Sequence, residues 1–346
     1  MTLTVVAWSA LGLTVLSGLF LVLLAVRGFA LAKEARRHLA AEERLRPTAL
    51  ALTSGEPDAI GTLDAADAEI IAGLLGRYAR QVKGKARTDI AIFFEERGFV
   101  ERELDQLRAR RTWKRARAAH LLGDMSSDRA SNALLEALDD PKREVRSAAA
   151  RSLGRLQCVE AVEPLVEALV RGRVPRAVAG QALLTIGSAS RERLCGLVPH
   201  QNPDVRAVAI ELLGLVGDAS DAPLVLAHLR DSAAEVRAKA GRALGRLGAE
   251  EAAAGLRAAL DDRIPFVRAT AAIALGMLAD RDAGSALLEQ ARRDEFDAAH
   301  SAAYSLAASD PARLWDAARR LGQGPHVAEA ADVTAVNRAR VVKGAA

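Results

Sequence analysis

Residues 144–156 read EVRSAAARSLGRL, and residues 235–247 read EVRAKAGRALGRL. When the chain is aligned on the Leu-Gly pair of these stretches, the same pattern recurs about every 31 residues. The glycine slot is filled, in chain order, by Gly123, Gly154, Gly187, Gly214, Gly245, Gly276 and Ala307. Self-similarity at a fixed period of this length is the signature of a repeat architecture, so the sequence predicts seven stacked copies of one unit.

Two further positions repeat together with the glycine slot. Alanine stands five residues before the slot in every copy, at Ala118, Ala149, Ala182, Ala209, Ala240, Ala271 and Ala302. Arginine stands eight residues before it in five copies, at Arg115, Arg146, Arg206, Arg237 and Arg268. Ala179 and Ala299 replace this arginine in the third and seventh copies, and the steps around Gly187 are 33 and 27 residues. We therefore expect a local irregularity around the third copy.

Each unit reads as two helices. The first helix is a short apolar-periodic segment, for example AVEPLVEAL (161–169). A turn separates it from the second helix, and in another copy this turn reads DDPKREVR (139–146) and offers Asp140 as an N-cap. The second helix then carries the repeated motif. We expect its alanine to be small because the paired helix crosses close to it, and its glycine to adopt a positive φ near the helix end.

At these residues the chain resembles the HEAT-like repeats, in the short form also seen in phycobilisome lyases. The resemblance rests on the pattern V-R-x-x-A-x-x-x-L-G and covers roughly residues 111–322. It implies an all-α fold, a right-handed α-solenoid of two-helix repeats. It also implies a stabilising ladder between neighbouring copies, made by Arg146, Arg237 and Arg268 with Asp140, Asp231 and Asp262. The signatures of tetratricopeptide and ankyrin repeats are missing.

The first segment reads as a membrane anchor. Residues 1–26 contain no charged side chain, and this uncharged segment is long enough for a transmembrane helix. Six basic residues follow within twenty positions, namely Arg27, Lys33, Arg36, Arg37, Arg44 and Arg46. The positive-inside rule then places the C-terminal side in the cytoplasm, so we expect a single-pass cell-membrane protein. The alternative is a cleaved signal peptide ending near Ala30-x-Ala32. The small residues Ala10, Thr14 and Gly18 allow a weak homodimer through this helix.

The chain divides into five predicted parts. Residues 1–46 form the anchor and a basic juxtamembrane helix that ends at Pro47, and residues 47–63 are a linker. Residues 64–110 form an N-terminal helical cap of three helices, the last two separated by Gly98. Residues 111–322 are the repeat array, and residues 323–346 have weak periodicity and are expected to be a disordered tail.

The sequence contains no recognisable catalytic constellation. The six histidines lack paired spacing, and there is no phosphate-binding loop or nucleophile elbow, so we expect no catalytic residue, metal or cofactor. Cys158 and Cys195 read as buried free thiols. The basic run RARRTWKRAR (108–117) has the residue types that bind phosphate or anionic lipid, but Arg115 belongs to the ladder and Trp113 fits an apolar packing position. With 48 basic and 44 acidic residues, the chain lacks the basic excess of a nucleic-acid-binding protein.

These observations favour a membrane-anchored scaffold. Stacked second helices make an extended concave surface, which we expect to bind a protein partner at the inner face of the membrane. Its outward positions are predicted seven, six or three residues before the glycine slot, at Arg151, Gln181, Leu184, Glu211, Lys239, Arg242, Ile273, His300 and Tyr304. The alternative class is an enzyme or enzyme subunit, such as a phycobilin lyase or a HEAT-like DNA glycosylase. The membrane anchor and the balanced charge both count against it.

Overall fold

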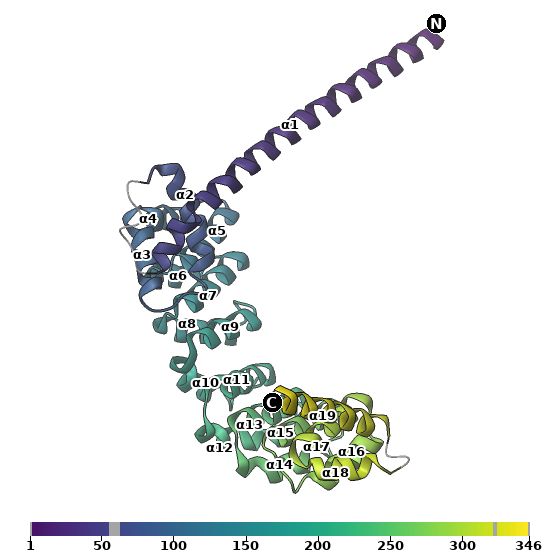
Figure 1. Cartoon of the computed structure of the whole chain (residues 1–346). Coiled ribbons are helices and arrows are strands. Elements are labelled where there is room, and N and C mark those ends of the chain that lie inside the picture. The colour runs from purple at the N-terminus through teal and green to yellow at the C-terminus, as the bar shows by residue number, and fades with distance from the viewer. Residues whose placement is uncertain (1, 55–62, 321–323, 345–346) are drawn as a thin grey trace. The chain divides into compact units, whose positions relative to one another are not determined.

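The computed structural model describes residues 2–54, 63–320 and 324–344, except for the side chains of residues 2–7, 9–19, 30 and 338–344. Within those ranges every regular element is a helix and there is no strand, which confirms the predicted all-α class (Figure 1). The chain divides into two compact units. The first comprises residues 1–108 and 121–130, and the second comprises residues 109–120 and 131–346.

The first unit is built around the C-terminal part of a long helix. Its helices are α1 (Thr2–Thr53), α2 (Ala65–Tyr78), α3 (Lys85–Glu96) and α4 (Phe99–Leu107). Asp64 caps α2 by accepting a hydrogen bond from the backbone N–H of Asp67, and Gly98, with φ of 70°, separates α3 from α4. The rings of Phe93, Phe94 and Phe99 pack on one another with centroids 5.7–6.0 Å apart. The three helices predicted for residues 64–110 are therefore present.

The predicted end of the first helix at Pro47 is wrong. Helix α1 continues through Pro47 to Thr53, so residues 47–53 are not a linker, and residues 55–62 lie outside the described residues. A proline inside a helix removes one backbone hydrogen bond and costs about 3 kcal/mol. Burial offsets that cost here, because Ala49 and Leu52 beyond the proline are 0% and 1% exposed.

Most side chains of the predicted membrane span, residues 1–26, lie outside the part of the chain that the structure describes. Among the residues that are described, none of the helices combines the length and apolar character that a membrane span requires.

Pairs of short and longer helices form the second unit. The first helices of the pairs are α6 (Ser131–Ala137), α8 (Val162–Val170), α10 (Arg191–Leu197), α12 (Ala222–Leu226), α14 (Ala253–Ala259), α16 (Gly284–Arg293) and α18 (Pro311–Ala318). The second helices are α7 (Arg143–Leu156), α9 (Arg176–Ile186), α11 (Pro203–Val216), α13 (Ala234–Leu247), α15 (Pro265–Met277), α17 (Phe296–Ser309) and α19 (Pro325–Gly344). Helix α5 (Thr112–Asp124), the second helix of the first copy, contributes residues to both units.

The repeated glycine is needed for close packing. In four copies it lies inside the second helix, and a Cβ atom there would approach the following copy far too closely. A Cβ on Gly214 would lie 2.7 Å from the Cα of Ala243, and one on Gly245 would lie 2.8 Å from the Cα of Ala274. The expectation of a positive φ is therefore wrong for these copies, because the constraint is the approach of the next helix.

The third copy departs from the pattern, as its irregular spacing predicts. Gly187 stands just after α9 with φ of 82°, a conformation that favours glycine, and no neighbouring atom lies within 4 Å of the position that a Cβ would take. The repeated alanines keep their expected place throughout, because each of the seven is at most 2% exposed.

The prediction of a disordered tail from residue 323 onward is wrong. Helix α19 covers Pro325–Gly344, and Val327, Ala330 and Ala331 on one of its faces are buried. These positions follow the i, i+3, i+4 spacing of a helix that buries one side. Their signal in the sequence is weak because two of them are alanines and the Leu-Gly motif is missing. Helices α18 and α19 thus extend the array by one pair.

We expect Gly214→Ala to lower the free energy of unfolding by about 1–3 kcal/mol, because the added methyl group forces α11 and α13 apart. Gly196→Ala in α10 is the matched control, since nothing lies within 4 Å of the position its Cβ would take. Alanine is the better helix former, so this control should be neutral or slightly stabilising. Denaturant unfolding of both variants tests the comparison, and equal stabilities would contradict the packing explanation.

Candidate functional site

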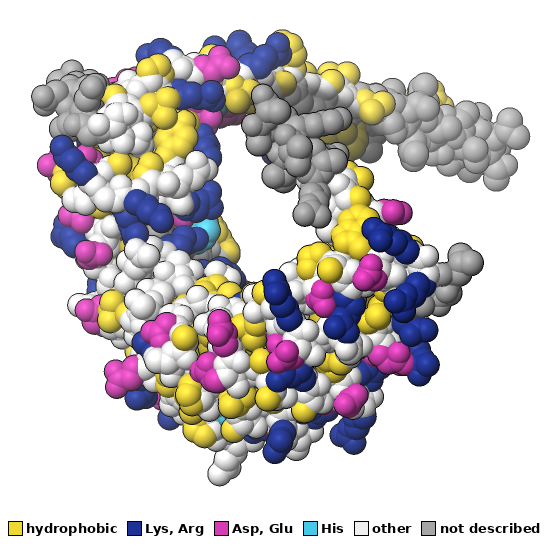
Figure 2. All heavy atoms as spheres, turned by 60° about the horizontal axis from the view of Figure 1, so that its bottom comes forward, with side chains coloured by type: hydrophobic (Ala, Val, Ile, Leu, Met, Phe, Trp, Pro, Cys, Tyr) yellow, Lys and Arg dark blue, Asp and Glu magenta, His cyan; other side chains and the backbone are white. Residues whose placement is uncertain are grey.

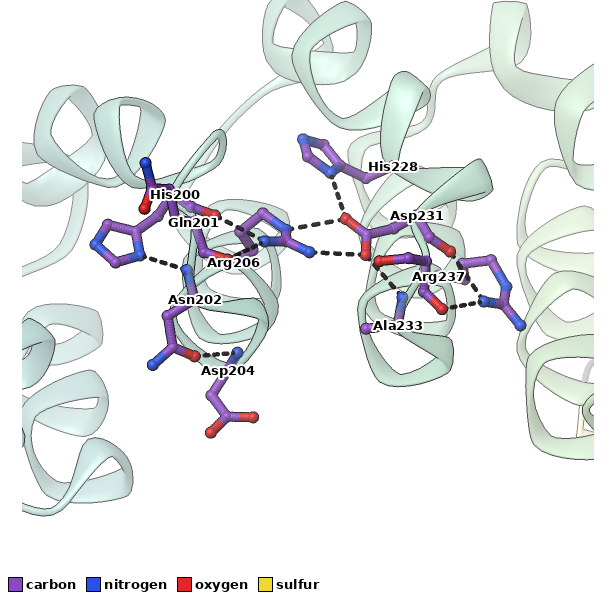
Figure 3. Close-up of polar contacts among 10 residues, drawn as sticks. His200, Gln201, Asn202, Asp204, Arg206, His228, Asp231, Ala233 and Arg237 are labelled. Atoms are coloured by element: carbon purple, nitrogen blue, oxygen red, sulfur yellow. Dashed lines mark hydrogen bonds and ion pairs between the residues drawn. The ribbon is translucent and has the colours of Figure 1, made fainter.

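A ladder of arginine and aspartate side chains joins successive turns of the array. In the rung shown in Figure 3, Arg206 donates from Nε and Nη2 to both carboxylate oxygens of Asp231, at 2.9 and 2.8 Å. Its Nη1 donates to the backbone carbonyls of His200 and Gln201, each at 2.8 Å. Asp231 in turn accepts a hydrogen bond from the backbone N–H of Ala233 at 2.9 Å, just before α13 begins. One ion pair therefore fixes two consecutive interhelical turns.

The same rung recurs along the chain. Further rungs pair Arg115 with Asp140, Arg237 with Asp262 and Arg268 with Asp294. The ladder implied by the family resemblance is thus present except at Arg146, and in each of these rungs the arginine reaches the aspartate of the following copy. Asp294 was not predicted, because it lies in the divergent turn RRDEFD.

The ladder is interrupted at the third copy. That copy has no aspartate at the turn, and Arg146 donates instead to the backbone carbonyl of Arg173 at 2.7 Å. Its Nη1 still donates to the carbonyls of Asp140 and Pro141. In the third copy Ala179 stands at the arginine position, so this copy has no arginine that could form a rung with the fourth copy.

The hydrogen bonds of a rung favour the ionised form of its aspartate. Burial by itself would raise the pKa of Asp231, but hydrogen bonds from Arg206, the N–H of Ala233 and His228 outweigh it and lower the pKa to about 2. For Asp262, too, burial opposes ionisation, and the hydrogen bond from Arg237 lowers its pKa. Both carboxylates are therefore ionised at neutral pH and occupied by their arginines, which assigns the ladder to stability and turn geometry.

The nine predicted partner-binding residues all have accessible side chains. Arg151, Gln181 and Ile273 are exposed, and the other six, Leu184, Glu211, Lys239, Arg242, His300 and Tyr304, are half-buried. They do not act as one group. Lys239 forms an ion pair with Glu211 across two neighbouring second helices, at 2.8 Å. His300 and Tyr304 lie side by side on α17, with ring centroids 4.5 Å apart.

Helix α15 carries an apolar stripe that was predicted only in part. Phe266, Ile273 and Met277 are 45%, 39% and 52% exposed. Their spacing of seven and then four residues places them on one face of the helix. Only Ile273 was predicted, because Phe266 and Met277 do not stand seven, six or three residues before the glycine slot. Contiguous exposed apolar side chains are a common feature of protein-binding surfaces.

The surroundings of this stripe are charged. At the corresponding positions of α13 stand Glu235, Arg242 and Arg246, so the apolar side chains have both charge signs beside them. More broadly, basic and acidic side chains are interspersed over the face that Figure 2 presents. This mixture differs from the one-signed surface that binds nucleic acid.

The residues of the basic run 108–117 have different surroundings in the structure. Arg115 is held in the ladder, where its Nη1 also donates to the carbonyl of Ala109 at 2.9 Å. Trp113, however, is 55% exposed, so its expected packing position is wrong, and the ammonium group of Lys114 lies 5.9 Å from the Trp113 ring centroid. The first turn of α5 simply leaves this ring on the solvent side.

Both cysteines are free thiols. Cys158 is buried as predicted, whereas Cys195 is only half-buried. Burial raises the pKa of each thiol, and the nearby carboxylate of Asp221 raises that of Cys195 further. Both are therefore protonated at neutral pH, which makes them poor nucleophiles.

Comparison with known proteins identifies the repeat. A family profile described as HEAT repeats matches residues 101–184 and 222–307. These two segments match HEAT repeats, which agrees with the stacked helix pairs of the array. The unmatched residues between them include the irregular turn at Gly187.

The chain is also similar to several solved structures. A complex of CpcE and CpcF of phycocyanin lyase from Nostoc sp. is 22% identical, with a TM-score of 0.36, over 68% of this chain and 94% of that one. Human deoxyhypusine hydroxylase in complex with glycerol is 21% identical, with a TM-score of 0.32, over 79% and 98%. An engineered protein is 20% identical, with a TM-score of 0.40, over 82% and 87%. At these scores the likenesses carry no argument about activity. No curated protein matches the chain.

We expect Asp231→Asn to destabilise the protein by about 2 kcal/mol at pH 7, because the variant loses the ion pair with Arg206. The folded pKa of Asp231 lies below that of the unfolded chain, so the ion pair's contribution is full above about pH 4 and disappears as pH falls toward 2. The difference between variant and parent should therefore shrink over this interval.

Denaturant unfolding at pH 7 and at pH 3 measures this difference. Asp261→Asn, an exposed aspartate in the corresponding turn of the next copy, is the control and should leave stability nearly unchanged. A difference that stays constant between the two pH values would show that the ion pair does not link protonation to folding.

Proposed function

We propose that the protein is a scaffold, held at the cytoplasmic face of the cell membrane by its N-terminal helix, that binds a protein partner on the open face of its second helices. The observation that carries the binding role is the apolar stripe of Phe266, Ile273 and Met277 on α15. Exposed side chains of this size lose contact with water when a partner covers them, at about 25 cal/mol for each Å² buried.

The arrangement favours an amphipathic helix as the partner segment. Phe266, Ile273 and Met277 follow helical spacing along a rigid helix, and the neighbouring α13 presents Glu235, Arg242 and Arg246. A partner helix can place its apolar face on α15 and its charged positions against α13. Ladder and glycine packing hold α13 and α15 in place, so the face is formed before the partner arrives, which lowers the entropic cost of binding.

The membrane part of the proposal rests on the start of the chain. Residues 1–26 lack charged side chains, and the first described residues beyond them belong to the same helix, α1. Along that helix Phe20, Leu21 and Phe29 are 63%, 65% and 67% exposed. Large apolar side chains that the protein itself leaves uncovered support an environment of lipid, and the basic residues from Arg27 onward support a cytoplasmic array.

We expect Ile273→Asp to weaken partner capture about five- to 150-fold, the range for a hot-spot loss of about 1–3 kcal/mol. The introduced carboxylate would lie unpaired under the partner. Val159→Asp is the matched control, since Val159 is also exposed, at 55%, but belongs to the turn η3 (Val159–Ala161) ahead of a first helix.

The measurement is affinity purification of the intact protein from membranes, with quantitative mass spectrometry for each variant and thermal melts to show equal folding. A protein that the parent and Val159→Asp capture equally, and Ile273→Asp loses, is the expected result. Loss with Val159→Asp and retention with Ile273→Asp would place the binding face on the first helices instead.

For topology, we expect a protease added outside intact cells to leave residues 64–344 uncut, because the array lies behind the membrane. The same protease should digest the array after the cells are opened with detergent. Digestion in intact cells would reverse the orientation, and release of the full chain from membranes by alkaline carbonate would contradict the anchor.

A further inference from the structure

Two histidines and a glutamate from different helices meet at the C-terminal end of the array. His300 lies on α17, and His326 and Glu329 lie one turn apart on α19. One nitrogen or oxygen atom of each of the three lies within 4.8 Å of the others. Sequence analysis predicted no metal site, because His300 and His326 are 26 positions apart and the second was assigned to a disordered tail. Packing of α19 against α17 brings them together.

The two imidazoles have unsatisfied nitrogen atoms. Nδ1 of His300 and Nδ1 of His326 are both shielded from solvent, and neither has a hydrogen-bond partner among the described residues. Leaving a buried polar atom without a partner costs about 1–3 kcal/mol. Both atoms face the same carboxylate oxygen, Oε2 of Glu329, at 3.8 and 3.9 Å, which is beyond hydrogen-bond distance. In this arrangement Glu329 therefore accepts a hydrogen bond from neither Nδ1 atom.

Neighbouring side chains fix this arrangement. The ring of Phe296 stacks on His300, with an interplanar angle of 10°, and packs edge-on against His326 at a centroid distance of 4.8 Å. The side chain of His326 is 13% exposed. The phenol of Tyr304 lies beside the carboxylate of Glu329. An aromatic cover and polar side chains beside a carboxylate ligand are features that orient the ligands of metal sites.

We propose that His300, His326 and Glu329 bind one divalent transition-metal ion of the zinc class, which fastens α19 to α17. Two imidazoles and one carboxylate are ligands that suit zinc, and three protein ligands with an open fourth position form a known type of zinc site. A cation at this point accepts the lone pairs of both Nδ1 atoms and balances the charge of Glu329.

Metal binding requires the three ligand atoms, which lie within 4.8 Å of one another, to move closer together. In a tetrahedral site with bonds of about 2.0–2.1 Å, neighbouring ligand atoms are about 3.3 Å apart. The observed separations to Oε2 of Glu329 are 3.8 and 3.9 Å, and Glu329 is half exposed and able to rotate toward the rings. This inference does not rest on the proposed partner binding. It reassigns His300 and Tyr304, two of the predicted partner-binding residues, to the metal and its surroundings.

The test is zinc binding to the full-length chain, purified in detergent and stripped with a chelator, measured by competition with a chromophoric chelator. We expect one zinc ion per chain at this site. Glu329→Gln should weaken binding at least about tenfold, and Tyr304→Phe, which removes the hydroxyl beside this ligand, should weaken it about ten- to a hundredfold. His120→Asn removes an exposed histidine elsewhere in the chain and is the matched control that should bind like the parent.

A second measurement tests the role in fastening α19. Zinc should raise the melting temperature of the parent and of His120→Asn, because a ligand that binds only the folded state stabilises it, but not that of His326→Asn. Circular dichroism without metal checks that the variants fold alike. The proposal is overturned if zinc does not bind, or if Glu329→Gln and His326→Asn bind it as tightly as the parent. It is also overturned if zinc stabilises His326→Asn as much as the parent.

Discussion

The close approach of successive second helices is the constraint on which the array depends. Where Gly245 faces Ala274, even one methyl group on the glycine would lie 2.8 Å from the neighbouring backbone. Contacts this close exclude water and allow the second helices to form a continuous packed layer. The short first helices leave grooves between them, such as one of about 710 Å³ between α12 and α14. Side chains on the exposed side of the second helices consequently stand on a rigid base.

The arginine–aspartate ladder fixes the turns between helices, whereas the glycines pack the second helices against one another. Arg237, for example, holds a carbonyl of its own turn and the carboxylate of Asp262 in the next, and that carboxylate accepts a hydrogen bond from the backbone N–H of Ile264, just before α15 begins. Desolvation offsets much of the attraction within a buried ion pair, although removing one partner destabilises the protein because the other charge is left unpaired. The value of the pair here is geometric, since planar guanidinium and carboxylate groups accept only one relative orientation. The third copy lacks both features, because Ala179 replaces the ladder arginine and Gly187 does not pack against the following helix.

The two proposed sites use this base in different ways. The stripe on α15 needs its helix rigid and its side chains uncovered, whereas the cluster of His300, His326 and Glu329 needs two helices brought to a fixed separation. Helix α19 buries Val327, Ala330 and Ala331, and the proposed metal ion shared with α17 would add an attachment beyond this burial.

The sequence by itself determined the repeat, its period, the helix pairs and the residues of most rungs, because these features are local and recur at fixed offsets. Asp294 and the end of the array were missed where the motif diverges. Only the tertiary structure decided why the glycines are required, since close approach involves a residue about 29 positions away. It also decided that Pro47 lies within α1, that Trp113 is exposed and that His300 meets His326. Each of these depends on which surfaces are covered when helices pack, and the pattern of one helix does not encode what covers it.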